Sequence, residues 1–467
     1  MDDETLAFAG LAAQAELIRA GEVDPRELVE LCLRRIEALD PALGAFRIVF
    51  AERALLDAEQ ARGRLGLGAE EERPLLGVPV AIKDSVDVAG ATTTHGTAAH
   101  GEAAQADAEV VRRLRAAGAI VIGKTRLPEL QLWPFTESAT FGVTRNPWNL
   151  DRTPGGSSGG SSAAVAAGLV GAAHASDGAG SIRLPAAACG LFGLKPQRGR
   201  VSTLPEVDAW HGLAHSGVLT RGVLDTAVYL DAVSDRGPGA PPLPERPFAE
   251  AAGTDPRPLR VALSLKPPAP TRITPVVRRA VEDTAELLRS LGHEVHEHDP
   301  DYGAVGVSVT SRVLRGTHDE AAHLPRPERL ERRTQRIAAL GGLISPKMIA
   351  RVRAGEAAHA ARLGGLFEDH DVLLTPTMPA PPQVVGAHEG RGALATLVAV
   401  GTGVAVFTGA WNATGQPAAS VPAGFTADGL PLAVQFVGRR NDEATLIALA
   451  GQLERARPWG DRRPPLG

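Results

Sequence analysis

The sequence has little of what disulfide frameworks and metal sites are built from. It holds two cysteines in 467 residues, Cys32 and Cys189, and neither belongs to a Cys-x-x-Cys pair. This scarcity excludes a disulfide-stapled scaffold and argues against a zinc site. Cys32 shares a helical face with Leu28 and Ile36, so we expect it to pack in the core.

Lysine is also scarce, because only five of the 49 basic residues are lysines. The formal net charge of -5 provides no basic field for nucleic acid, so no nucleic-acid partner is expected. Lysine, unlike arginine, can lose its proton near neutral pH when it is buried, which makes each one a candidate base. The five are Lys83, Lys124, Lys195, Lys266 and Lys347.

No hydrophobic run is long enough, without interruption, to suggest a membrane span. The longest uncharged stretch, residues 392–427, is broken by Gly, Pro, Asn and Gln, so we expect buried core and loops there and no membrane contact. The N-terminus reads MDDETLAFAG, with acidic residues where a secretory signal carries positive charge. With 44% hydrophobic and 22% charged residues the composition is globular, and a cytoplasmic location is expected.

Helix-like and strand-like patterns alternate along the chain, which predicts an α/β fold. Helices are expected from Pro25 behind the N-cap Asp24, over 107–118, over 163–173, and from Pro275. Strands are expected over seven apolar stretches: 75–84, 119–123, 190–195, 259–265, 293–298, 371–379 and 430–438.

We predict one domain over residues 1–467, without internal repeats. Its expected parts are a helical N-terminal part (about 1–70), a core (about 71–235), a variable insertion (about 236–370) and a return to the core (about 371–467). The Pro/Gly-rich residues 236–258 are the best linker candidate, and 301–370 is expected to be mostly helical.

Three motif matches lack the context that their chemistry requires. GAIVIGKT (118–125) fits a phosphate-binding pattern, but its middle residues read as a strand and not as a loop. GGSSG (155–159) fits the nucleophile elbow of α/β-hydrolases, with Ser157 as an esterase nucleophile, but a polar loop precedes it where a strand is required. His296 and His298 share a strand face, which we interpret as a solvated edge strand, so no metal site is predicted.

Three other segments can together perform acyl transfer. They are Lys83 at the end of a buried strand, the serine cluster at 157–162, and SDGAGSIRLP at 176–185. The small residues before Ser181 allow successive backbone N–H groups to converge on one point, which can hold an oxyanion. A serine at the end of such a run is well placed to be acylated, although a tight turn before a helix also explains the pattern.

An activating base must accompany Ser181, and no histidine lies in either motif core. His174 lies upstream and is expected to be a packing residue. At an ordinary pKa of 10.4, roughly one lysine in 2500 is neutral at pH 7, but burial can lower that pKa by several units. Lys83 is therefore the candidate base, and a second serine hydroxyl can bridge it to the nucleophile.

The run TPGGSSGGSSAAVAAGLVGAAHASDGAGSIRLPAAACGLFGLKP resembles the signature of the amidase signature family, and GVPVAIKDSVDVAGATTTHGT resembles its lysine segment. The resemblance covers most of the chain except about 236–370. It implies the amidase signature fold, an α/β domain with a mixed central sheet flanked by helices on both faces. It also implies Ser181 as the acylated nucleophile, Ser157 on a cis peptide as the bridging serine, and Lys83 as the base.

The resemblance implies the surroundings of these three residues as well. The oxyanion hole would be formed by the backbone at Gly178, Ala179, Gly180 and Ser181, where Ala179 replaces a glycine that many members have. Supporting polar positions match Ser158, Asp177 and Arg183. Four aromatic residues are candidates for an acyl pocket and equally for the core: Trp133, Phe135, Trp210 and Trp411.

The implied reaction is hydrolysis of a small-molecule carboxylic amide to acid and amine, without a cofactor or a metal. A homodimer is left open as the assembly. One alternative within the family is the A subunit of a tRNA-dependent amidotransferase, which works with partner subunits and takes glutamine as the amide. The esterase with Ser157 as its nucleophile is a second alternative.

Overall fold

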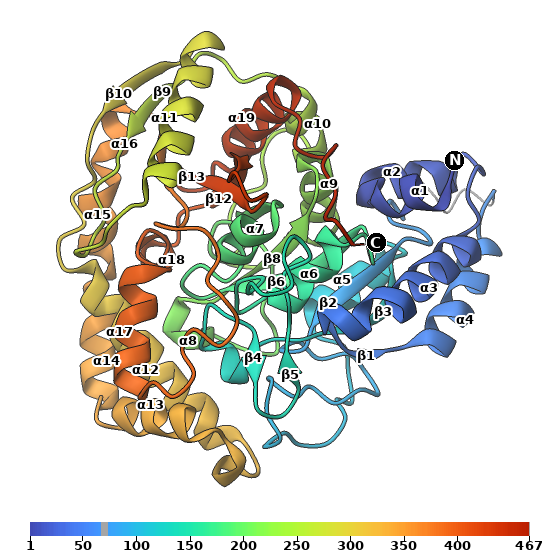
Figure 1. Cartoon of the computed structure of the whole chain (residues 1–467), viewed down its shortest axis with the longest axis horizontal. Coiled ribbons are helices and arrows are strands. Elements are labelled where there is room, and N and C mark those ends of the chain that lie inside the picture. The colour runs from blue at the N-terminus through green and yellow to red at the C-terminus, as the bar shows by residue number, and fades with distance from the viewer. Residues whose placement is uncertain (67–72, 467) are drawn as a thin grey trace.

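The computed structural model describes residues 1–66 and 73–466, and a mixed β-sheet runs through its centre (Figure 1). Within these residues the sheet has 11 strands in the order β1-β3-β2-β6-β8-β7-β12-β13-β11-β9-β10, and β4 and β5 form a separate pair. The strands are β1 Phe46–Val49, β2 Pro79–Lys83, β3 Ile120–Thr125, β4 Glu137–Ser138, β5 Gly142–Val143, β6 Ala172–Asp177, β7 Phe192–Lys195, β8 His215–Thr220, β9 Arg260–Leu263, β10 Glu294–Glu297, β11 Val372–Pro376, β12 Ala418–Phe425 and β13 Pro431–Gly438.

Helices cover the sheet and extend beyond it. They are α1 Asp3–Phe8, α2 Gly10–Arg19, α3 Pro25–Leu43, α4 Ala51–Arg62, α5 Glu109–Ala116, α6 Gly159–Ala166, α7 Arg183–Cys189, α8 Ala209–Gly212, α9 Val223–Val233, α10 Phe248–Gly253, α11 Pro275–Ser290, α12 Val305–His323, α13 Arg332–Gly342, α14 Pro346–Ala354, α15 Glu356–Gly364, α16 Leu366–Asp369, α17 Ala393–Gly403, α18 Gly409–Thr414 and α19 Glu443–Ala456. Short 3-10 turns lie at Glu129–Gln131 and Pro327–Arg329.

Both faces of the sheet are buried, as β2 illustrates. All five of its residues are buried; Val80 and Ile82 join one hydrophobic cluster, and Ala81 joins another on the opposite face. Strands covered on both faces read as nearly continuous apolar runs, which explains the stretch VPVAI. β2 is parallel to β3 and β6, whereas β6 and β8 are antiparallel. The predicted α/β fold with a mixed sheet flanked by helices is confirmed.

Most predicted elements lie where their patterns place them. α3 begins at Pro25, and the Asp24 side chain accepts a hydrogen bond from the Arg26 N–H. The seven predicted strands correspond to β2, β3, β7, β9, β10, β11 and β13, with ends that differ by a few residues. Residues 301–370 are mostly helical, as predicted.

The helix predicted over 163–173 is wrong in its limits. α6 begins earlier, at Gly159, and ends at Ala166, and Gly168 then adopts a left-handed φ of 64°. Residues 172–177 form β6, which pairs with β2 on one side and β8 on the other. The alanines of this segment are compatible with a helix and with a strand, so pairing with the neighbouring strands decides the conformation of residues 172–177.

The stretch predicted as a linker is partly ordered in the core. Within residues 236–258, α10 begins at Phe248, whose side chain is buried and packs in the main hydrophobic cluster. Just beyond it, β9 pairs with β11 and β10 pairs with β9. The chain from 236 to 370 therefore contributes two strands to the central sheet.

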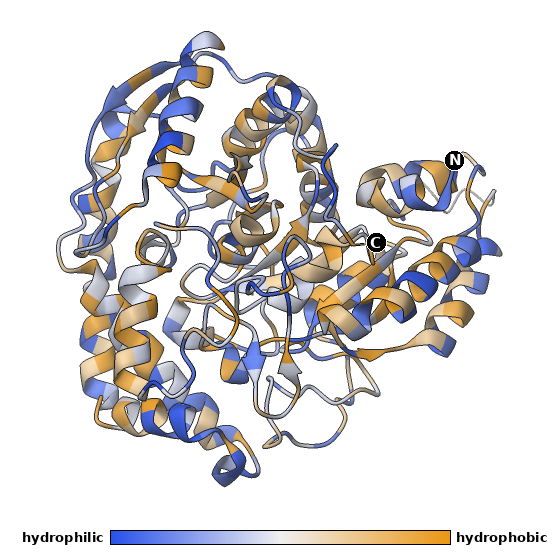
Figure 2. Ribbon diagram, in the orientation of Figure 1, coloured by the Kyte–Doolittle hydropathy of each residue, from blue (hydrophilic) through white to orange (hydrophobic). Residues whose placement is uncertain are grey.

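Hydrophobic residues concentrate on the central strands, whereas outer helices such as α3 carry both hydrophobic and hydrophilic stripes (Figure 2). The uncharged run 392–427 contains α17, α18 and all of β12. Across residues 1–66 and 73–466, no helix is both long and apolar enough to cross a bilayer.

Candidate active site

Lys83 ends β2, and its side chain is 0% exposed. Because β2 lies beside β6, the amine reaches both the serine loop and the end of β6. Its Nζ lies 2.8 Å from Ser157 Oγ and 2.8 Å from Ser176 Oγ. The structure thus brings Lys83 and Ser157 together, as the sequence predicts.

The environment of Lys83 favours the neutral amine. Burial lowers the pKa of Lys83 to about 7, and the acidic groups Asp177, Glu320 and Glu206 oppose this only partly. No ion pair involves Lys83 among the residues that the structure describes, whereas the equally buried Lys124 lies 2.9 Å from an Asp84 carboxylate oxygen. Lys83 is therefore suited to accept a proton near neutral pH.

The loop at 153–162 is rich in glycine because other backbone segments approach it closely. A Cβ on Gly156 would lie 2.6 Å from the Trp133 carbonyl oxygen, and a Cβ on Gly160 would lie 2.5 Å from the backbone nitrogen of Arg126. No side chain fits at such distances. The Gly156–Ser157 peptide bond is cis, the geometry that the family resemblance implies.

The other serines of this loop are structural. They do not line the cavity described below, and their hydroxyls are hydrogen-bonded to backbone carbonyls. The Ser158 hydroxyl donates to the Ser176 carbonyl at 3.2 Å. The Ser161 hydroxyl donates to the His174 carbonyl at 2.8 Å, and the Ser162 hydroxyl donates to the Pro154 carbonyl at 3.0 Å. Ser157 differs from them because its hydroxyl faces Lys83.

Ser181 lies on a turn after β6 that a buried ion pair fixes. Asp177 and Arg183 are both 0% exposed and lie 3.0 Å apart. Asn412 on α18 donates to Asp177 Oδ1 at 2.8 Å and accepts from Arg183 at 2.6 Å. Burial alone would raise the pKa of Asp177, but Arg183 and the hydrogen bond from Asn412 hold it below its usual value. These three side chains set the position of Ser181.

The oxyanion hole expected from Gly178 to Ser181 needs one correction. The Gly180 N–H donates to Asp177 Oδ1 at 2.6 Å, so this donor is already bound to a carboxylate and is not free for a substrate oxygen. The N–H groups of Gly178, Ala179 and Ser181 have no acceptor in the described part of the chain, so they remain candidates. Gly180 shapes the turn, with a φ of 131° that favours glycine.

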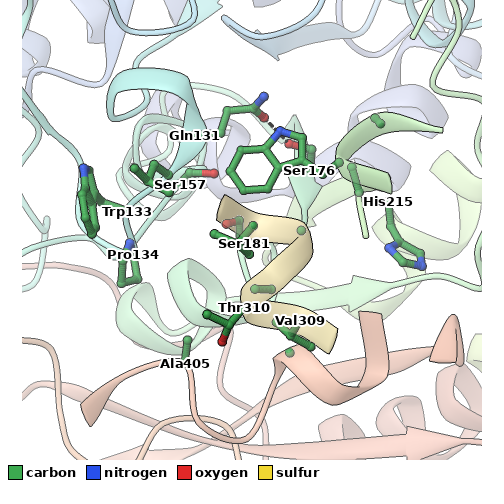
Figure 3. Close-up of a pocket in the computed structure, with 18 of the residues that line it drawn as sticks. Gln131, Trp133, Pro134, Ser157, Ser176, Ser181, His215, Val309, Thr310 and Ala405 are labelled. Carbon is green, nitrogen blue, oxygen red and sulfur yellow. Dashed lines mark hydrogen bonds between the residues drawn. The ribbon is translucent and has the colours of Figure 1, made fainter. Parts of the chain in front are cut away.

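Ser157, Ser176 and Ser181 line one cavity of about 710 Å³. Figure 3 shows Ser157 and Ser181 around its centre, with Gln131 and Ser176 on one side and Val309, Thr310 and Ala405 on the other. A volume of this size accommodates a ligand as large as a typical drug molecule.

The four aromatic candidates divide into two groups. Trp133 and Trp210 line the cavity. Phe135 is buried behind Trp133, with ring centroids 5.8 Å apart. Trp411 is fully buried and packs against Tyr302, so it belongs to the core.

Sequence reasoning missed two polar residues of the site, Ser176 and Gln131. The Ser176 hydroxyl donates to Gln131 Oε1 at 2.9 Å and lies beside Lys83. Ser176 directly precedes Asp177, and its place beside β2 would have followed from a strand prediction at 172–177. Gln131 ends the short 3-10 turn Glu129–Gln131 with a φ of 58°, and no sequence pattern indicates where its side chain lies.

No group of three or more His, Cys, Asp and Glu side chains is placed to hold a metal ion within residues 1–66 and 73–466. His296 is exposed on β10, which lies at the end of the sheet order. His174, expected to be a packing residue, is buried on β6 with Nε2 2.9 Å from Ser216 Oγ, and it also borders the cavity.

The fold and this site define a class of enzyme. The family model described as Amidase matches residues 27–447, so the chain belongs to the amidase family of amidase signature enzymes. It is a hydrolase of carbon–nitrogen amide bonds.

The chain is 52% identical, over 99% of each chain, to the Mycobacterium tuberculosis protein named "Putative amidase AmiB2". It is 34% identical to the 6-aminohexanoate-cyclic-dimer hydrolase of Paenarthrobacter ureafaciens, with 97% of this chain and 96% of that protein covered. A solved structure of 6-aminohexanoate cyclic dimer hydrolase complexed with substrate has a TM-score of 0.89 and 34% identity, covering 98% of this chain and 99% of that one.

Proposed function

We propose that the protein hydrolyses a small-molecule carboxylic amide through an acyl-enzyme on Ser181, with Ser157 and Lys83 as the proton relay. The observation that carries this proposal is the 2.8 Å contact between Ser157 Oγ and a buried lysine amine that has no carboxylate partner within residues 1–66 and 73–466. A hydroxyl-bridged lysine base is one of the known variants of serine-nucleophile catalysis.

Two neighbours orient the lone pair of Lys83. Gln131 Oε1 can only accept, so the Ser176 O–H points to it and the Ser176 oxygen accepts an N–H of Lys83. The lone pair of the neutral amine is then free to accept the Ser157 hydroxyl proton. Ser176 and Gln131 are therefore positioning residues for the base.

The reaction follows from these contacts. Lys83 accepts the proton of Ser157 while Ser157 accepts that of Ser181, and Ser181 Oγ forms a bond to the carbonyl carbon. Free N–H groups among Gly178, Ala179 and Ser181 stabilise the oxyanion. The relay then returns the proton to the leaving nitrogen as the C–N bond breaks. A water molecule, deprotonated by the same relay, cleaves the acyl-enzyme and releases the acid.

The test is labelling of the nucleophile with a fluorophosphonate probe, read by peptide mass spectrometry. We expect the adduct on Ser181 in the wild type and no adduct in Ser181→Ala. Ser202→Ala is the matched control, because Ser202 lines the same cavity without a role in the relay, and it should label normally. An adduct on Ser157 instead would favour the esterase alternative.

A second measurement addresses the amidotransferase alternative. The proposal expects the purified chain to release acid and amine from a simple amide without partner proteins. A chain that hydrolyses glutamine only in the presence of other subunits would be an amidotransferase subunit instead.

A further inference from the structure

The cavity around Ser181 has one wall that is almost entirely aliphatic. One face of α17 and one face of α12 form this wall, and neither lies in the signature segments. The wall residues include Val305, Val309, Val313, Leu394, Leu397 and Val398. Leu394 and Val398 line the cavity and are also 61% and 56% exposed, so the wall continues to the mouth.

The direction of the proposed proton relay places the acyl part of the substrate on this side. Ser157 returns a proton to the leaving nitrogen, so the amine must lie toward Ser157 and Lys83, and the acyl part lies across Ser181 from them. On that far side, a Cβ on Gly409 would lie 3.1 Å from Val309 and 3.9 Å from Ala179, so α12 meets the nucleophile turn here. Figure 3 shows Val309 and Ala405 across Ser181 from Ser176.

The charges of the cavity have one sign. No lysine or arginine lines it among the described residues, and the acidic side chains that do are Asp87 and Glu206. Burial raises the pKa of Glu206 to about 7, so this carboxyl carries only part of a negative charge at neutral pH. The lining histidines His95, His174 and His215 are neutral at pH 7, because burial lowers the pKa of each. A substrate carboxylate seated between α12 and α17 would therefore find aliphatic carbon and no cation, and an unpaired buried charge binds poorly.

We propose that the enzyme selects amides with an uncharged aliphatic acyl chain, seated between α12 and α17, and discriminates against acyl chains that end in a carboxylate. This inference rests on the proposed acyl-enzyme mechanism and names the substrate class of the same site.

The test uses acyl p-nitroanilides of four to ten carbons, each paired with the equally long chain that ends in a carboxylate. The expected wild-type result is a kcat/KM that rises with the length of the methyl-ended chain and exceeds that of the carboxylate-ended partner by about 100-fold or more. Val398→Arg places a cation at the mouth and should raise kcat/KM at least tenfold for one or more carboxylate-ended substrates.

Ala395→Arg is the matched control, because Ala395 lies on the same helix, is exposed and does not line the cavity. It should leave the preference unchanged. Equal wild-type rates for both series, or a Val398→Arg variant that keeps the wild-type preference, would overturn the inference. So would a lack of turnover of both series while the fluorophosphonate probe still labels Ser181, whereas a loss of that labelling would refute the proposed mechanism itself.

Discussion

Replacing Lys83 by methionine should abolish activity and at the same time stabilise the fold at neutral pH. The free energy of unfolding is the quantity that tests the environment of the base directly. The pKa of Lys83 falls from 10.5 to about 7 because the amine is buried. The unfolded chain therefore binds more protons than the folded chain between pH 7 and 10.5, so wild-type stability rises with pH across that interval.

The magnitude follows from the size of the shift. Holding Lys83 neutral costs the folded state about 4 kcal/mol at pH 7 and about 2 kcal/mol at pH 9. Methionine removes this cost and also loses two hydrogen bonds, each worth roughly 1 kcal/mol. The net gain is about 2 kcal/mol at pH 7 and near zero at pH 9. For 467 residues this corresponds to a rise in Tm of about 2 °C at pH 7.

The assay is the difference in Tm between Lys83→Met and the wild type at pH 6, 7, 8 and 9, by calorimetry or circular dichroism. Lys124→Met is the control, because Lys124 is equally buried and its pKa is also lowered by burial, but it is paired with Asp84, so its loss should lower Tm at pH 7. A Tm difference for Lys83→Met that does not change between pH 6 and 9 would mean that Lys83 keeps an ordinary pKa.

The kcat/KM of Lys83 variants provides a second test of Lys83 as the base. Lys83→Arg keeps the positive charge but cannot accept a proton in this range, so it should lose as much activity as Lys83→Met, roughly 100- to 10,000-fold in kcat/KM. A folded Lys83→Arg variant that keeps more than a tenth of wild-type kcat/KM would refute Lys83 as the base.

Three other predictions follow from the same geometry. kcat/KM should rise with pH through about 7 as Lys83 loses its proton, and a profile that is flat from pH 6 to 8 would contradict this. Gln131→Glu should shift this rise in kcat/KM to higher pH, because a carboxylate near Lys83 favours the ammonium form, whereas Gln131→Leu should lower kcat. A Gln131→Glu profile that rises at the same pH as the wild type would refute the positioning role of Gln131. EDTA should leave hydrolysis of a p-nitroanilide unchanged, and a loss that zinc restores would point to a metal in the reaction.

The sequence by itself determined the class of fold, the enzyme family and the candidate catalytic residues. Two kinds of local structural constraint leave patterns in the sequence from which the fold and the catalytic residues can be predicted. VPVAI is apolar on both strand faces, which requires a sheet covered on both sides. The glycines around Ser157 are required by close backbone contacts, and such positions leave a fixed pattern in the sequence.

Tertiary structure decided what depends on contacts between distant segments. Residues 172–177 are as compatible with a helix as with a strand, and pairing with β2 and β8 makes them β6. That pairing also places Ser176 beside Lys83. The Gly180 N–H looks free in the sequence, and only the fold shows that Asp177 accepts it.

The aliphatic wall of the cavity is a second feature that could not be predicted from local sequence patterns. It joins α12 and α17 to a nucleophile more than a hundred residues earlier in the chain. A local pattern records which face of a helix is apolar, but not which cavity that face lines. The reaction chemistry can therefore be inferred from short motifs, whereas the shape and charge of the substrate site come from how distant helices pack.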